Sequence, residues 1–128
     1  MKRMLVVAAL ASALAGCAGD TPRLFGPSGP ARTSDGVLVA GTNGMTLYTF
    51  DKDTPGKSAC AGGCAANWPP FIAPADAKPV GDFTLVTRDD GAKQWAYKGK
   101  PLYFWVKDQK PGERTGDGFN NVWRVARP

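Results

Sequence analysis

An internal repeat constrains the fold more than any other feature of this sequence. Tyr48 recurs as Tyr103, Asp53 as Asp108 and Trp68 as Trp123, each 55 residues later. A Pro-Gly pair follows the Asp in both copies. Self-similarity at a fixed spacing indicates two copies of one structural unit. Two such units related by pseudo-symmetry are expected to bury their apolar faces against each other.

Each copy is predicted to form a hairpin followed by a long loop that returns to a Trp. In the first copy, strands at residues 36–40 and 45–50 flank Asn43-Gly44, a dipeptide typical of two-residue hairpin turns. In the second copy, strands at 93–97 and 101–106 flank Lys98-Gly99. A further strand at 83–87 precedes a turn at 89–91, and residues 122–125 form a closing strand. The predicted fold is mainly all-β, a small pseudo-twofold sandwich or open barrel with long loops.

The strand period places aromatic side chains on common faces. Tyr48 lies on one face with Phe50, and Tyr103 on one face with Trp105, because alternate residues of a strand point the same way. Most of the aromatics are expected to form the core. The alternative is that Trp95, Phe104 or Trp105 is exposed and marks a ligand surface. Nearby lysines, Lys93, Lys98, Lys100 and Lys107, would then suit an anionic or carbohydrate partner.

The repeated motif resembles that of a family of secreted-repeat lipoproteins marked by Tyr-x-aromatic-x-x-Asp. It stands at residues 48–53 and again at 103–108. The similarity extends over Cys60, Cys64, Trp68-Pro69-Pro70, and Asp90-Gly91 with Gln94, and covers about residues 36–127. The resemblance implies a location in the cell envelope and a two-repeat architecture, and it supplies no reaction.

The first residues have the layout of a lipoprotein signal peptide. Lys2 and Arg3 precede a short apolar run that is too short to span a bilayer, and Leu14-Ala15-Gly16-Cys17 follows as a lipobox. Residues 1–16 are therefore predicted to be removed and Cys17 to be acylated, with palmitate among its chains. Several chains on one Cys give durable anchoring. An ordinary secretory signal is the alternative.

The residues after the lipobox indicate where the protein resides. Residues 17–34 are rich in Gly, Pro, Ser and Thr and are predicted to form a flexible tether, which leaves residues 35–128 as one domain of two repeats, about 36–72 and 83–127. Ala18 is not Asp, a residue that favours inner-membrane retention at this position. An anchor in the outer membrane, facing the periplasm, is therefore expected over the inner membrane.

The net charge argues against a nucleic-acid partner. The chain carries 16 Lys and Arg against 11 Asp and Glu, a net charge of +5. Loss of Lys2 and Arg3 with the signal peptide lowers the basic excess further. The basic residues are scattered singly or in pairs, which is typical of a solvated surface rather than a nucleic-acid stripe.

Cys60 and Cys64 are predicted to form a disulfide, because an even pair at close spacing is usually oxidised in the envelope. Gly62-Gly63 supplies the flexibility that the short loop needs. A redox-active pair is one alternative, although redox motifs usually have two intervening residues rather than three. A soft-metal site that includes Met45 is another.

The absence of histidine removes the triads, haem attachment and common zinc or copper sites that depend on imidazole. Asp53 and Asp108 are expected to cap turns by accepting backbone N–H bonds. Ca²⁺ binding remains open at two clusters of oxygen-bearing side chains: Asp51 with Asp53, and Asp117 with Asn120 and Asn121. No catalytic residue, metal or cofactor is predicted, and the chain is not expected to be an enzyme.

Two functions remain open from the sequence. The first is a non-catalytic binding or structural module, anchored to the membrane by its lipid, with an envelope protein or a glycan as partner. The second is a redox or metal-handling accessory protein of the periplasm, working through the Cys pair or nearby Asp residues. The first hypothesis has two forms. In one the repeated Tyr and Asp residues form a structural scaffold, and in the other they form the binding site.

Overall fold

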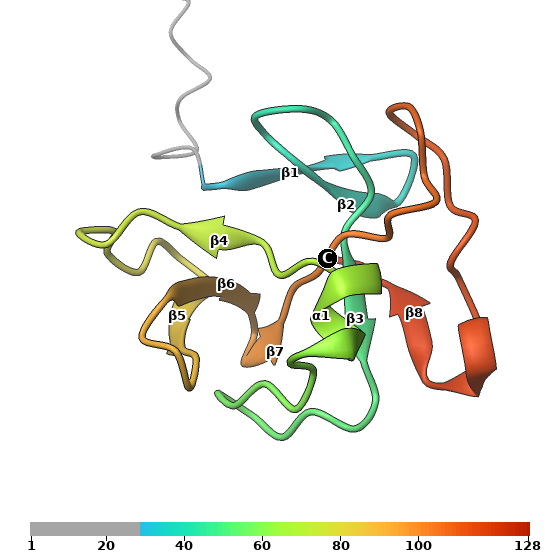
Figure 1. The fold of residues 1–128 in the computed structure, drawn as a ribbon. Helices are drawn as coiled ribbons and strands as arrows, with labels where there is room; N and C mark the ends of the chain where they lie inside the picture. Colours follow the sequence, from blue (N-terminus) through green and yellow to red (C-terminus); the bar gives the residue numbers. More distant parts are fainter. Residues whose placement is uncertain (1–28) are drawn as a thin grey trace, which may run out of the picture.

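The protein is described here by a computed structural model of residues 29–128, so the predicted signal peptide, Cys17 and most of the predicted tether lie outside the described residues. The strands are β1 (Ala31–Ser34), β2 (Val37–Ala40), β3 (Tyr48–Phe50), β4 (Ile72–Ala73), β5 (Phe83–Thr87), β6 (Lys93–Tyr97), β7 (Lys100–Pro101) and β8 (Trp123–Val125). Helix is limited in this part to α1 (Gly63–Asn67) and the 3₁₀ turn η2 (Phe119–Asn121). The small antiparallel sheets confirm the predicted all-β, two-repeat class (Figure 1).

Two-residue turns set the register of two hairpins. Asp35-Gly36 joins β1 to β2 with φ of 50° and 83°, and Lys98-Gly99 joins β6 to β7 with φ of 51° and 85°. Positive φ at both central positions defines a type I′ turn, whose twist matches that of the flanking strands. The predicted turn at Lys98-Gly99 and the strands at 83–87 and 93–97 are therefore confirmed.

The predicted two-residue turn at Asn43-Gly44 is wrong. The Ala40 N–H donates to the Met45 carbonyl at 2.9 Å, so residues 41–44 together make the turn. Asn43 does not adopt positive φ. Its side-chain oxygen instead accepts the Met45 N–H at 2.9 Å. Because an Asn side chain can replace a backbone acceptor in this way, the dipeptide becomes part of a longer turn.

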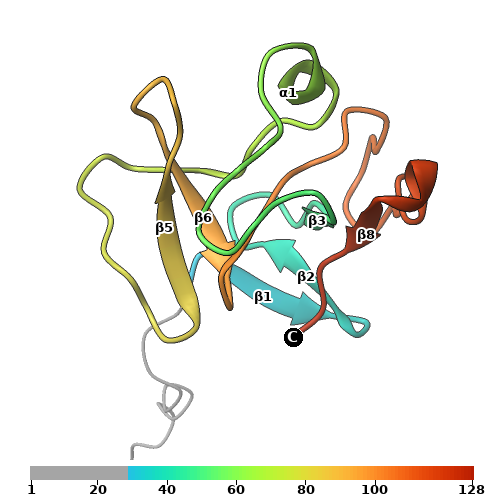
Figure 2. The same ribbon diagram turned by 90° about the horizontal axis from the view of Figure 1, so that it is seen from below.

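The folded domain begins before residue 35, where the predicted tether was expected to end. Residues 31–34 form β1 and pair with β2, from Ala31 opposite Ala40 to Ser34 opposite Val37 (Figure 2). The polar sequence of β1 gave no strand pattern, since β1 is an exposed edge strand that is stabilised by its backbone pairing with β2. One feature of the sequence could have indicated the turn after β1: Asp35-Gly36 lies 55 residues before Asp90-Gly91.

The two repeats interlock rather than pack as separate hairpins. Each predicted second strand divides: residues 45–47 stay with β2, whereas β3 pairs with β8 of the second repeat. In the equivalent place, residues 68–70 of the first repeat run beside residues 103–105 of the second, with Pro70 opposite Tyr103. The return segment of each repeat therefore completes the sheet of the other, and neither repeat closes on itself.

The junction of the repeats lies at the two motif tyrosines. The Tyr48 N–H donates to the Tyr103 carbonyl at 2.8 Å, and the Tyr103 N–H donates to the Tyr48 carbonyl at 2.9 Å. Both residues are fully buried. This reciprocal pair relates the two halves by the pseudo-twofold symmetry that the repeat predicts.

A stack of four aromatic rings fills the core between the repeats. Phe50 stacks on Trp123 with ring centroids 4.2 Å apart, Trp123 on Trp68 at 3.8 Å, and Trp68 on Trp105 at 4.0 Å. Equivalent residues of the two repeats occupy equivalent places, Phe50 and Trp105 at the ends and the two other Trp in the middle. Stacked rings of this size bury much apolar surface in a small domain.

The prediction that most aromatics form core is confirmed. Trp95 is 8% exposed and Trp105 is 7% exposed, and Phe104 is half-buried. These side chains therefore do not make the exposed aromatic surface that was the alternative. A second core cluster surrounds Trp95 and includes Leu38, Leu47 and Leu102.

Candidate functional site

Two hydrogen bonds cross between the repeats, and we call them the tyrosine–aspartate bridges. The Tyr48 hydroxyl donates to Asp108 Oδ2 at 2.7 Å, and the Tyr103 hydroxyl donates to Asp53 Oδ2 at 2.7 Å. Each Tyr is thus paired with the Asp of the other repeat. The sequence predicted that these positions are equivalent, but the spacing of the motif within one repeat carried no signal for an exchange between repeats.

The second oxygen of each Asp holds the loop that follows it. Asp53 Oδ1 accepts the Ala59 N–H at 2.6 Å, and Asp108 Oδ1 accepts the Thr115 N–H at 2.9 Å. These are the predicted bonds from turn backbone to carboxylate. Each motif Asp therefore fixes its own loop with one oxygen and the other repeat with the second.

Burial decides the ionisation of the two phenols. It raises the pKa of Tyr48 and of Tyr103 far above the ordinary tyrosine value, and the neighbouring carboxylates of Asp108 and Asp53 raise it further. Burial also raises the pKa of Asp53. Both phenols therefore stay neutral hydrogen-bond donors to a more alkaline pH than an exposed tyrosine does, as a scaffold needs.

The Tyr103 hydroxyl contacts a network of polar side chains that includes Ser58, Arg88 and Gln94. Ser58 Oγ lies 2.6 Å from the Tyr103 hydroxyl, and Arg88 Nη1 donates to Ser58 Oγ at 3.0 Å and to Gln94 Oε1 at 2.7 Å. Arg88 Nη2 donates to the Cys60 carbonyl at 2.6 Å. Sequence reasoning missed Arg88, because a single Arg after a strand has no distinctive pattern.

A glycine takes the equivalent place at the other bridge. The Gly116 N–H donates to the Tyr48 hydroxyl at 3.2 Å. A Cβ at Gly116 would lie 2.6 Å from Trp68 and 2.9 Å from Trp105, so the aromatic stack leaves no room for a side chain. The scaffold is therefore shared by the two repeats, while its polar surroundings differ.

Cys60 and Cys64 form a disulfide with their Cα atoms 5.2 Å apart. Cys60 is fully buried against the core and Cys64 lies in α1. In this state neither sulfur is a free thiol for redox exchange or for a soft metal. The bond closes a short loop that leads to Trp68.

The other candidate carboxylates are engaged separately. Asp51 forms an ion pair with Arg124 at 2.9 Å, and Asp117 Oδ1 accepts the Val125 N–H at 3.2 Å. Asn120 and Asn121 adopt left-handed backbone angles in the η2 turn. Within residues 29–128, no group of three or more Cys, Asp or Glu side chains is arranged to hold a metal ion.

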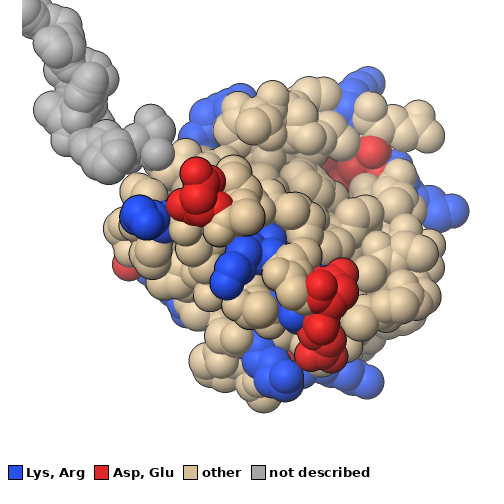
Figure 3. All heavy atoms as spheres, turned by 60° about the vertical axis from the view of Figure 1, so that its left-hand side comes forward, with Lys and Arg blue, Asp and Glu red and all other residues tan. Residues whose placement is uncertain are grey.

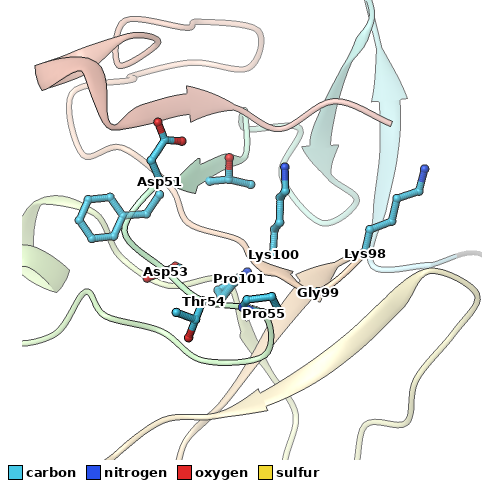
Figure 4. A pocket seen from close by; sticks show the side chains of 10 residues that line it. Asp51, Asp53, Thr54, Pro55, Lys98, Gly99, Lys100 and Pro101 are labelled. Atoms are coloured by element: carbon cyan, nitrogen blue, oxygen red, sulfur yellow. The ribbon is translucent and has the colours of Figure 1, made fainter.

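A pocket of about 250 Å³ opens between the loop after β3 and the β6–β7 turn, and we call it the β3–β7 pocket (Figure 4). Its lining is Thr49, Phe50, Asp51, Asp53, Thr54, Pro55, Lys98, Gly99, Lys100 and Pro101. The Gly56 N–H donates to the Gly99 carbonyl at 2.9 Å and ties the two walls together. The pocket therefore has walls from both repeats.

A second hollow of about 430 Å³ adjoins this pocket and shares Thr49, Asp51 and Lys100 with it. Arg127 lines the hollow. Asp51 is paired with Arg124. The cations Lys98, Lys100 and Arg127 form no ion pair in the described part of the chain. The face of the molecule shown in Figure 3 carries interspersed basic and acidic side chains.

Comparison with known proteins identifies the family. Residues 29–72 and 84–127, which together exceed half of the chain, match the family described as a secreted repeat of unknown function, and the chain belongs to it. The two matched segments confirm the duplication and extend the first repeat to include β1. No curated protein and no solved structure matches the chain significantly. Within residues 29–128, no helix has the length and apolar character to cross a membrane.

Proposed function

We propose that this protein is a lipid-anchored, non-catalytic binding module of the cell envelope. Membership of a secreted family supports export, and the lipobox at Cys17 supports an anchor, with the periplasmic face of the outer membrane as the favoured site. An envelope protein or a glycan is the expected partner. The redox or metal-handling alternative gains no support from Cys60, which is buried and disulfide-bonded.

One observation carries the binding proposal: the repeats share their scaffold but differ at the β3–β7 pocket. By the 55-residue spacing, Lys100 corresponds to Met45, and Asp51 corresponds to Val106. The motif tyrosines and aspartates are engaged in the bridges and leave no free group for a ligand. A pocket whose lysines and Asp51 have no charged counterpart at the pseudo-symmetric positions of the scaffold is the best candidate for recognition.

Metabolic labelling with tagged palmitate tests the anchor. The wild-type chain is expected to incorporate the label, and Cys17→Ser is expected to abolish it because the acylated thiol is gone. Cys60→Ser serves as the matched control and retains the label. Label on the Cys17→Ser chain would rule out anchoring at this residue.

Photo-crosslinking in cells tests the binding role. A photoreactive residue is placed at Thr54, which is exposed at the pocket, and in a second strain at Asp76, which is exposed away from it. A discrete adduct of envelope protein or glycan is expected at Thr54 and not at Asp76. Equal adducts at both positions, or none at Thr54, would contradict a binding role for the pocket.

A further inference from the structure

We propose that the ligand of the β3–β7 pocket is a carboxylated sugar unit of an anionic glycan. This inference rests on the proposed binding function and narrows it to one chemical class. Three properties of the pocket support a carboxylated sugar: two lysines without an ion-pair partner within residues 29–128, an aromatic ring in the wall, and an acidic side chain that disfavours a ligand group with two negative charges.

The free charge at the pocket is positive. Arg124 neutralises Asp51 at 2.9 Å, and in Figure 4 the Asp51 carboxylate points toward β8 rather than toward the two lysines. The Asp53 carboxylate accepts hydrogen bonds from Tyr103 and Ala59. The ammonium groups of Lys98 and Lys100 are left to meet an anion.

The two lysines are displayed by a rigid turn. They flank Gly99 in the type I′ turn and extend from it in the same general direction (Figure 4). Lys98 Nζ lies 5.3 Å from the centroid of the Tyr97 ring, a cation–π distance that holds its stem near the turn. Two ammonium groups on one short turn suit one carboxylate group of a ligand.

The rest of the lining suits a sugar ring. Phe50 is half-buried, stacks on Trp123 and also lines the pocket. The hydroxyls of Thr49 and Thr54 line the same pocket and can exchange hydrogen bonds with sugar hydroxyls. An apolar ring beside a few polar groups is the usual composition of a small-ligand site.

An acidic residue of the pocket favours a carboxylate over a phosphate. Asp53 borders the space and forms no ion pair in the described part of the chain, and like charges in a partly buried site repel. A ligand with one negative charge meets less of this repulsion than a phosphate monoester with nearly two. A carboxylated sugar therefore combines the charge and the hydroxyls that the lining requires.

Calorimetric titration of the full-length lipidated chain in nanodiscs tests the inference. The probe is a galacturonic acid oligomer, and a neutral galactose oligomer of equal length is the matched ligand. The acidic oligomer is expected to bind. The neutral oligomer is expected to bind at least about tenfold more weakly, because it lacks the carboxylates that meet Lys98 and Lys100; tenfold corresponds to about 1.4 kcal/mol. Binding should also weaken as salt is raised.

The variant for this experiment is Lys98→Asn with Lys100→Gln. Asn tolerates the positive φ at position 98, so the turn is kept while both charges are removed. Loss of about tenfold in affinity is expected, whereas the control Lys93→Gln with Lys107→Gln is expected to bind like the parent. Both variants should melt like the parent, because the side chains at positions 98, 100 and 107 are exposed and Lys93 makes only an exposed hydrogen bond, to Thr87 Oγ1 at 3.0 Å.

The outcomes separate the inference from the function on which it rests. Equal binding of the neutral oligomer, tighter binding of a poly-glutamate peptide, or no binding of the acidic oligomer would overturn the carboxylated sugar. In each case an adduct at Thr54 in cells would still support a binding pocket. Failure of the crosslinking at Thr54 would reject the binding function itself.

Discussion

At the residue scale, the duplicated motif acts through groups that are far apart in sequence. Tyr48 and Asp108 are separated by 60 positions, and Tyr103 and Asp53 by 50 positions. A repeat shows which residues are equivalent, but an equivalent pair can bond within a repeat or across repeats with the same sequence pattern. The exchange is visible only once the strands are paired.

The raised pKa values of the two tyrosines predict a loss of stability at alkaline pH. Unfolded tyrosines ionise near pH 10, whereas folded Tyr48 and Tyr103 keep their protons to higher pH. The unfolded state therefore releases protons first, and the free energy of unfolding is expected to fall as pH rises above about 10. Denaturant melts at pH about 8 and about 11 measure this change.

The matched comparison uses Tyr→Phe variants, which lack the ionisable hydroxyl. Tyr48→Phe and Tyr103→Phe should each be less stable at pH about 8 by about 1 to 3 kcal/mol, since each removes the tyrosine donor from one oxygen of a carboxylate, that of buried Asp108 or of half-buried Asp53. Their stability should also fall less steeply with alkaline pH. An identical alkaline slope in parent and variants would show that the two phenols do not control it.

At the element scale, local signals in the sequence predicted β5, β6 and β8 of the second repeat and the turn after β6. The strands predicted at residues 83–87 and 93–97 and the Lys98-Gly99 turn agree with the structure, whereas the strand predicted at 101–106 is divided. The two-residue turn predicted at Asn43-Gly44 was wrong because the Asn43 side chain, in place of a backbone carbonyl, accepts the Met45 N–H. β1 was missed because a polar edge strand has no apolar alternation. The pocket was not predictable, since its walls come from both repeats.

The loop before η2 offers a steric prediction. Gly116→Ala would place a Cβ against two stacked Trp rings, at 2.6 Å from Trp68, so the variant is expected to lose about 1 to 3 kcal/mol of stability. Gly63→Ala is the matched control, because its Cβ would meet nothing within 4 Å and Ala favours the helix. Thermal melts of both variants decide it, and equal melting temperatures would contradict the packing of this loop on the stack.

At the scale of the whole molecule, the two repeats are interlocked and share one aromatic core stack. Each return segment pairs with the other repeat, and the core stack takes two rings from each half. A small unit alone buries too little surface to offset its conformational entropy. Duplication therefore supplies both the core and, between the repeats, the walls of the candidate pocket.

A truncated chain tests this cooperativity. A protein that ends at residue 80 retains the first repeat but lacks β8 and the rings of Trp105 and Trp123. It is expected to be unfolded by circular dichroism at all temperatures. A cooperative melt of this single repeat would show that the halves are independent units.

Two double-mutant cycles on Tyr48 measure the exchange between repeats itself. The first combines Tyr48→Phe with Asp108→Ala, and the second combines Tyr48→Phe with Asp53→Ala, with the free energy of unfolding measured for every variant. The structure predicts a coupling of about 1 to 3 kcal/mol in the first cycle and about zero in the second. Coupling of Tyr48 to Asp53 of its own repeat, with none to Asp108, would contradict the cross-repeat scaffold.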